Sequence, residues 1–474
     1  MLSLAKYFAS KNYWAKDIIF LISDQDLVGT QAWLNAYHDV RTSDVLISSP
    51  LLASSGPIQA AVNLELHTSQ MSSIDIKIEG LNGQLPNLDL FNVAVELCTR
   101  ESVTPTFQLA SHPFAGPELD VWKQYAATAL SMMRSQAISS PTGAHGLFQK
   151  FAIQSITLKS VERKSTGSEK QYASVSLLQV GRVVEGIFRS LNNLLERFNR
   201  SYWFYLLPST RRYLSIGYYM IPFALITSPL ILTALRGYIH LSYGQQHDHK
   251  SPAGQQDHKD RKLPEEVIEE SAPLEEGIPF WFFAHLMGLI LLSIPFLMER
   301  HVSAVFVSDN WSTESLVYST IVSFSLLVIL TPVLKGSTKS KLAQKVIGLL
   351  NAALLFSCIS LINISLALAL SLIYSPVLSV VGQPGSQSSR IRSLSHKLLL
   401  ILIHPISINY SCHLAMSMYL HSEASVAEHV SGALHSQKAA LLSCIEDWYI
   451  YGHWMYLLSS AFLFPVWLQA WCCT

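Results

Sequence analysis

Hydrophobic and polar residues alternate in short segments before about Tyr202, whereas long apolar blocks follow Tyr213. In the first part, strand-length apolar runs are separated by longer amphipathic segments, a pattern typical of a sheet covered by helices. We therefore predict strands at 17–22, 58–66, 73–78 and 153–159, and helices at 30–37, 87–98, 118–135 and 175–200.

The apolar blocks after Tyr213 are long enough to cross a bilayer, which takes about 20 residues. We predict spans at 213–241, 280–298, 315–334, 397–419 and 449–470. The block at 346–380 is too long for one ordinary span and just long enough for two short ones.

Four regions follow from this pattern. Residues 1–200 form an α/β domain, and 201–243 form an interfacial segment with the first span. Residues 244–278 are polar and poor in aromatics, which predicts a disordered cytosolic loop. Residues 279–474 form an all-α transmembrane bundle with five or six further spans.

Basic residues orient the spans, because cytosolic loops are enriched in lysine and arginine. The loops containing Lys335 and Arg390 are both cytosolic only if block 346–380 crosses twice, which gives seven spans. Six spans would leave one basic loop on the wrong side. Either count places residues 1–200 on the non-cytosolic side, where the glycosylation sequons at Asn199 and Asn310 fit.

Composition excludes some classes of function. The 33 basic and 33 acidic residues balance, so nothing indicates binding to nucleic acid. The six cysteines show neither zinc-ligand spacing nor a disulfide framework. A tract with three histidines, starting at His247, is interpreted as a solvated linker rather than a metal site.

Several long stretches carry a family resemblance: YWAKDIIFLISDQDLVGTQAWLNAYHDV, GPIQAAVNLEL, IEGLNGQLPNLDL, HGLFQKFAIQSITL and LNNLLERFNRSYWFYLLP. They resemble, in the same order, the Gaa-type anchor attachment subunits of glycosylphosphatidylinositol (GPI) transamidase. The resemblance implies a multi-pass protein of the endoplasmic reticulum membrane with a lumenal N-terminal domain. It also implies other transamidase subunits, the GPI lipid and proproteins with a C-terminal GPI signal as partners. A separate caspase-like cysteine protease subunit would perform the cutting.

The soluble part of that family is similar to di-zinc aminopeptidases, which carry a Glu-Glu pair six and five residues before a glycine. Counting back from Gly29, these positions hold Ser23 and Asp24, so the general base is absent. An Asn-x-Asp pattern corresponds to Asn63-Leu64-Glu65, and a final His-x-x-Phe pattern corresponds to His145-Gly146-Leu147-Phe148. A first histidine and a bridging aspartate would precede Met1.

Three metal-site interpretations remain at Asp24, Glu65 and His145. Hydrolytic zinc chemistry requires about six ligands for two ions, of which the resemblance supplies three. A single structural calcium or zinc ion at Asp24 and Glu65 needs fewer ligands. We favour the third interpretation, in which both carboxylates are hydrogen-bonded turn or strand-end residues and no cofactor is bound.

The final span contains a mid-span proline, Pro465, which frees a backbone carbonyl and kinks a helix. In the resembled family a proline of the last span is implicated in holding the GPI lipid, and Pro465 is the matching residue. Pro465 and the neighbouring Trp467 are therefore the lipid-site candidates. For the polar span residues Asn363, His404, Asn409 and His413 we favour contacts between helices over ligand contacts.

Family members begin with a membrane span and further strands that precede the residues seen here. We therefore expect an N-terminally truncated form of such a subunit with an incomplete α/β domain. The favoured hypothesis is a non-catalytic subunit that recognises GPI and presents it to the proprotein. One alternative is a metal-dependent enzyme that activates the GPI amine. A transporter is disfavoured because the spans contain almost no charged residues.

Overall fold

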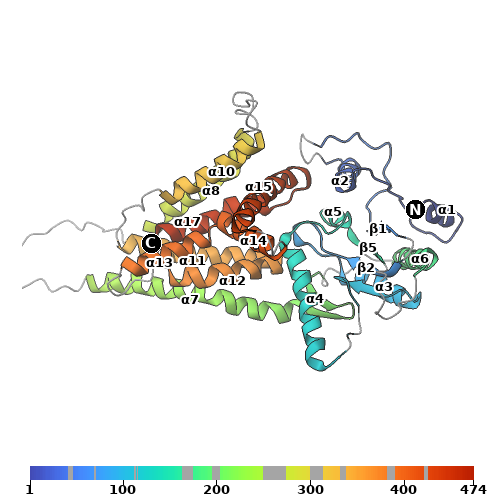
Figure 1. Ribbon diagram of the computed structural model, residues 1–474, viewed down its shortest axis with the longest axis horizontal. Coiled ribbons are helices and arrows are strands. Elements are labelled where there is room, and N and C mark those ends of the chain that lie inside the picture. The colour runs from blue at the N-terminus through green and yellow to red at the C-terminus, as the bar shows by residue number, and fades with distance from the viewer. Residues whose placement is uncertain are drawn as a thin grey trace, which may run out of the picture. The chain divides into compact units, whose positions relative to one another are not determined.

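The computed structural model describes residues 1–40, 46–68, 71–111, 114, 116–162, 175–194, 203–248, 274–298, 313–330, 338–381, 390–420 and 425–473. The chain divides into two compact units (Figure 1). The first contains Met1–Pro222, Ile359–Ala367 and Glu446–His453, and the second contains Phe223–Cys358, Leu368–Ile445 and Trp454–Thr474.

A mixed five-stranded sheet forms the centre of the first unit. Its strands are β1 (Ala60–Glu65), β2 (Met71–Lys77), β3 (Pro105–Phe107), β4 (Ala110–Ser111) and β5 (Gln154–Glu162), in the order β1-β5-β2-β3-β4. β5 runs parallel to β1 and antiparallel to β2, while β2 runs parallel to β3. The strands predicted at 58–66, 73–78 and 153–159 are thereby confirmed.

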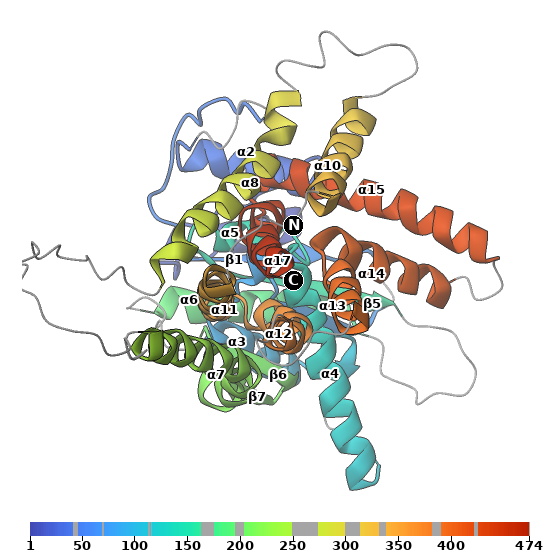
Figure 2. The same ribbon diagram turned by 90° about the vertical axis from the view of Figure 1, so that its left-hand side faces the viewer.

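Helices cover both faces of this sheet. Figures 1 and 2 show α2 (Asp26–Tyr37) and α5 (His145–Gln149) on one side, and α3 (Leu88–Arg100) and α6 (Leu177–Asn193) on the other. The unit also contains α1 (Leu2–Ala9), η1 (Leu81–Gly83), α4 (Glu118–Ile138) and a hairpin of β6 (Tyr205–Ser209) and β7 (Arg212–Ser215). The four predicted helices are confirmed, although α6 ends at Asn193.

Local sequence signals explain where two of these helices begin. The Asn87 side chain caps α3 by accepting a hydrogen bond from the Asp89 backbone amide at 2.9 Å. Ser176 and Gln179 form a reciprocal capping box at the start of α6. The apolar faces of both helices then pack on the sheet or on each other, with Phe91 and Ile187 fully buried.

The strand predicted at 17–22 is wrong. The segment is extended but forms no ladder, and Ile19 and Ile22 are 43% and 70% exposed. In the described part of the chain, β1 pairs only with β5, so this apolar run has no strand beside it to complete the hydrogen bonds. An apolar sequence alone does not form a strand without such a partner.

The second unit is helical. It contains most of four helices that also extend into the first unit, α7 (Ile216–Asp248), α11 (Thr338–Ser360), α12 (Ile364–Val380) and α15 (Val426–Tyr451). The rest of the bundle is α8 (Ile278–Leu297), α10 (Thr313–Leu330), α13 (Arg390–Leu402), α14 (Pro405–Leu420), α16 (Met455–Leu457), η5 (Leu458–Leu463) and α17 (Phe464–Cys472). A short 3-10 turn, η3 (Glu275–Gly277), precedes α8.

Four helices of the described chain are long and apolar enough to span a membrane, or five if the bent pair α13–α14 counts as one. Two shorter apolar helices lie at Thr313–Val328 and Ile364–Val380. The block at 346–380 is divided into two helices, as its length suggested.

Two predictions for this part need correction, and one helix was missed. The predicted span at 397–419 is bent by 66° at a break before Pro405, which cannot donate a backbone hydrogen bond. α7 extends to Asp248, beyond the start of the predicted loop, and residues 249–273 lie outside the described residues. The helix α15 was missed because its mixed polar sequence lacks an apolar block.

Candidate functional site

The acidic turn at Asp24 is built around a glycine. Gln25 and Asp26 both adopt left-handed backbone angles, with φ of 59° and 48°. A Cβ atom on Gly29 would lie 1.8 Å from the Asp24 carbonyl oxygen, so only glycine fits this close approach. The Asp24 side chain is exposed, and its Oδ1 accepts a hydrogen bond from the Gln25 amide at 2.9 Å. The Asp24 carboxylate therefore has a hydrogen-bond donor within the turn itself.

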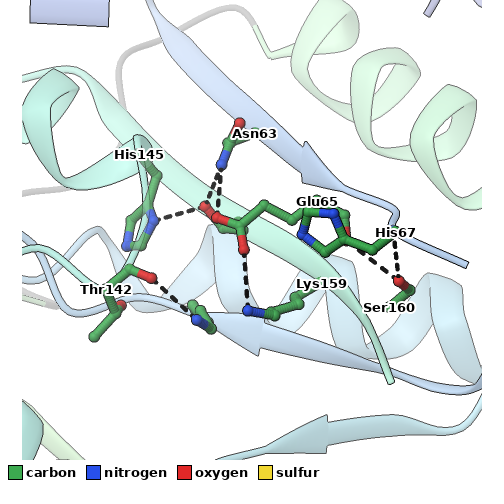
Figure 3. A network of polar contacts seen from close by, with 9 residues as sticks. Asn63, Glu65, His67, Thr142, His145, Lys159 and Ser160 are labelled. Atoms are coloured by element: carbon green, nitrogen blue, oxygen red, sulfur yellow. Dashed lines mark hydrogen bonds and ion pairs between the residues drawn. The ribbon is translucent and has the colours of Figure 1, made fainter. Parts of the chain in front are cut away.

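Glu65, at the end of β1, is already paired with protein groups (Figure 3). Its Oε2 lies 3.5 Å from the Lys159 Nζ, and its Oε1 accepts a hydrogen bond from the Asn63 amide at 3.3 Å. The lysine thus supplies the positive charge that a metal ion would supply, and an ion at Glu65 would have to displace it.

His145 lies at the start of α5 and is fully buried. Its Nδ1 lies 2.7 Å from the Thr157 hydroxyl, which also accepts a hydrogen bond from Asn63 at 3.0 Å. The Thr157 hydroxyl can therefore donate to Nδ1. The His145 Nε2 has no hydrogen-bond partner among the described residues. Burial lowers the pKa of His145 to about 3, so the imidazole is neutral and cannot exchange protons near pH 7.

Strand register explains why these side chains meet. Asn63 pairs with Thr157 across β1 and β5, and Thr157 pairs with Lys77 across β5 and β2. The next row of the same face holds Glu65, Lys159 and Asp75. Burial lowers the pKa of Lys77, whose Nζ donates a hydrogen bond to the Thr142 carbonyl oxygen at 3.1 Å.

Thr157, Lys159 and Lys77 were missed by the reasoning from sequence. Their alternation with apolar residues along two strands was the available signal, because residues two apart share a face. That signal places polar residues on one face but does not reveal their partners without the register.

A cavity of about 800 Å³ lies beside this network in the first unit. Asn63, Glu65, His67 and His145 contribute to its wall, and so do aromatic side chains such as Trp14 and Trp33. Asp26 lines it, whereas Asp24 does not. Glu65 and His145 thus share one cavity, which the Asp24 turn reaches through Asp26 but not through Asp24 itself.

No group of three histidine, cysteine, aspartate or glutamate side chains that could hold a metal ion occurs in the described part of the chain. The three predicted ligands are therefore not assembled into one such site. A single ion at Asp24 and Glu65 stays a prediction.

The lipid-site candidates lie in α17 of the second unit. The preceding segment η5, Leu458–Leu463, has π-helical geometry, and Pro465 follows directly in the first turn of α17. Gly288 of α8 packs against this junction, since a Cβ atom there would lie 2.6 Å from the Pro465 Cγ.

Trp467 is fully buried, and its Nε1 donates a hydrogen bond to the Leu400 carbonyl oxygen at 2.7 Å. The carbonyl belongs to the last turn of α13, which Pro405 prevents from continuing. The His404 ring packs edge-on against the Trp467 ring, with the two ring centroids 4.4 Å apart. Trp467 therefore stabilises the broken helix. The sequons at Asn199 and Asn310 lie outside the described residues.

Comparison with known proteins places the chain among components of GPI transamidase. The chain is 33% identical over 241 residues to the "GPI transamidase component gaa1" of Schizosaccharomyces pombe, an alignment that covers 50% of this chain and 40% of the relative. It is 31% identical over 251 residues to the "GPI transamidase component GAA1" of Saccharomyces cerevisiae, covering 51% of this chain and 36% of the relative. These alignments thus span less than half the length of either relative. The family described as "Gaa1-like, GPI transamidase component" matches residues 1–471, and the chain belongs to this family.

Proposed function

We propose that the full-length protein is a non-catalytic subunit of GPI transamidase in the endoplasmic reticulum membrane. It recognises the GPI lipid and presents it for attachment to the C-terminus of proproteins. Its partners are the other subunits, including the caspase-like cysteine protease that cuts the signal. Positioning two substrates accelerates their reaction without acid–base groups on the positioning subunit.

The geometry of the first unit supports a non-catalytic role. Ser23 stands where a general base is required, and the neutral His145 cannot transfer protons at lumenal pH. Lys159 neutralises Glu65. Glu65 is thus paired with a lysine and His145 is neutral, which supports a role without acid–base catalysis.

The junction between η5 and Pro465 carries the lipid part of the proposal. π-helical turns are rare and occur often at functional sites, because they widen the helix and leave backbone carbonyls without their usual partners. Here six residues of π geometry precede a proline in an apolar span, against a glycine of α8. In this proposal Pro465 shapes the lipid-binding surface, and Trp467 holds α17 in place through Leu400.

Replacing Pro465 tests this proposal. We expect Pro465→Ala, in the full-length protein expressed in cells that lack their own copy, to lower GPI-anchored protein at the cell surface several-fold. Co-purification with the other subunits, which measures assembly of the complex, should be unchanged. Pro376→Ala is the matched control, because Pro376 also lies inside an apolar helix, α12. Equal surface levels for both variants would refute a role of Pro465 in lipid presentation.

The alternative, a metal-dependent enzyme that activates the GPI amine, is supported by one observation. Glu65 and His145 line the same cavity. Metal analysis of the purified complex separates the two proposals. A non-catalytic subunit predicts less than one zinc or calcium ion per chain and normal transamidation by Asp24→Ala and Glu65→Gln. One ion per chain that is lost together with activity in Glu65→Gln would favour the enzyme.

A further inference from the structure

A small polar cavity lies inside the second unit, between α11, α12 and α17. Its volume is about 20 Å³. Lys345 of α11, together with Gln469 and Cys473 at the end of the chain, provides its polar wall, and the remaining lining residues are apolar or glycine. None of the described residues that line it is acidic.

Two of these side chains are buried and have polar atoms without partners. Lys345 is 8% exposed and Gln469 is 2% exposed. The Lys345 Nζ and both amide atoms of Gln469 form no hydrogen bond with any described residue. A buried ammonium without a partner is costly, and so is each unpaired amide atom. Three such atoms around one cavity indicate a ligand that binds there.

The unpaired atoms define the chemistry of that ligand. The ammonium donates hydrogen bonds and carries a positive charge, and the amide nitrogen also donates. An anionic oxygen satisfies both donors and compensates the charge, whereas a water molecule leaves the charge uncompensated. The Gln469 Oε1 is an acceptor and receives no hydrogen bond from such an oxygen. Gly348 gives the amide space, because a Cβ atom at this position would lie 3.1 Å from the Gln469 Oε1.

The position of Lys345 along its helix indicates where the anion comes from. Lys345 is seven residues from the start of α11, or about 10 Å along a helix. The preceding residues belong to the basic loop that the charge pattern predicts to be cytosolic. Lys345 lies five residues inside the apolar stretch Ser340–Ser360. Side chains of a helix lean towards its N-terminus, which is here the predicted cytosolic end, so the ammonium extends towards the headgroups. Basic pockets between membrane helices on the cytosolic side bind lipid headgroups.

We propose that this cavity binds a phosphate oxygen of a phospholipid from the cytosolic leaflet. A cavity of about 20 Å³ accommodates one water-sized group. One non-bridging oxygen enters it, while the rest of the headgroup stays outside. The cavity adjoins the GPI-lipid site proposed at Pro465, since Val466 lines it, and the two proposals differ in the lipid that is bound.

Lipid analysis of the purified complex tests this site. We expect Lys345→Met, which preserves side-chain length and removes the charge, to reduce one co-purifying phospholipid species about tenfold, as expected for loss of a charged hydrogen bond. Lys345→Arg should retain the lipid. Lys397→Met is the matched control, since Lys397 is another lysine predicted to be cytosolic and does not line the cavity.

Thermal stability distinguishes a lipid from free phosphate and from water. A short-chain phospholipid should raise the thermal midpoint of the wild-type complex and leave that of Lys345→Met unchanged. Inorganic phosphate should not reproduce the increase. Stabilisation by inorganic phosphate alone would overturn the lipid assignment. Unchanged lipid content in Lys345→Met would overturn the site. If that variant also has a higher thermal midpoint than the wild type, the cavity holds a buried water instead.

Discussion

At the scale of single residues, Gly29 determines whether the Asp24 turn can form. Gly29→Ala would place a Cβ atom 1.8 Å from the Asp24 carbonyl oxygen, so the turn must shift. We expect a loss of about 2 kcal/mol, or a decrease of about 4–8 °C in the thermal midpoint of the purified chain.

The matched control is Gly181→Ala, in the interior of α6. The nearest atom to a Cβ atom there is 3.9 Å away, and alanine favours helix over glycine. The midpoint should therefore stay the same or increase. If both variants lower the midpoint equally, the close approach at Gly29 does not determine the turn.

The buried His145 makes stability depend on pH. Its pKa is lowered to about 3, so the unfolded chain binds a proton below pH 6.5 that the folded chain cannot bind. The free energy of unfolding should therefore fall on acidification from pH 6.5 towards pH 3, by about 1.4 kcal/mol per pH unit.

Thermal midpoints measured between pH 7.5 and pH 5 check this dependence. His145→Gln should show a smaller decrease on acidification than the wild type. His67→Gln, at an exposed histidine that follows β1, should decrease like the wild type. Identical pH profiles for all three proteins would contradict the assignment to His145.

At the scale of elements, the turn between α11 and α12 is held by Asn363, which is fully buried in the first unit. Its Nδ2 donates to the Gln136 carbonyl oxygen at 2.7 Å and to the Ser139 hydroxyl at 3.0 Å. Its Oδ1 accepts from the Leu366 amide at 3.0 Å and caps α12. Asn363 was predicted to make contacts between helices, and its partners Gln136 and Ser139 lie at the C-terminal end of α4.

Asn363→Ala should therefore be strongly destabilising. It removes these contacts and a longer hydrogen bond from Nδ2 to the Asn82 carbonyl oxygen at 3.5 Å, and it leaves buried acceptors without this partner. We expect a loss of about 2–4 kcal/mol in thermal unfolding. Asn351→Ala, in α11, removes an amide whose Nδ2 has no partner among the described residues and should have little effect. Similar losses for both variants would show that the contacts of Asn363 do not stabilise the turn.

Which elements could be predicted depended on whether the signal was local. The Asn87 cap, the strand at 153–159 and the division of block 346–380 follow from residue spacing and length. The segment 17–22 and the helix α15 were misjudged, because strand formation needs a partner and a polar helix needs its tertiary contacts. At the site, Glu65 and His145 were found through family pattern, while Lys159 became visible only through the register of β1 and β5.

At the scale of the whole molecule, two independent observations support seven spans. Ile359–Ala367 and Glu446–His453 belong to the same compact unit as Met1–Pro222. If that unit is lumenal, α11 arrives at the lumenal side and α12 leaves it, so the N-terminal end of α11 and the C-terminal end of α12 lie on the cytosolic side. The lysines and arginines near these segments favour the same side.

Glycosylation of inserted acceptor sites tests this topology. An Asn-x-Thr acceptor in a flexible insert after Gly385 should stay unmodified, and the same insert after Ser422 should carry a glycan that a glycosidase removes. The natural Asn310 should be modified in both proteins, and Asn310→Gln identifies its band. Six spans predict the reverse pattern for the two inserts, because a single crossing of block 346–380 inverts every later segment. The two inserts therefore give opposite results for the two topologies, and each serves as the control for the other.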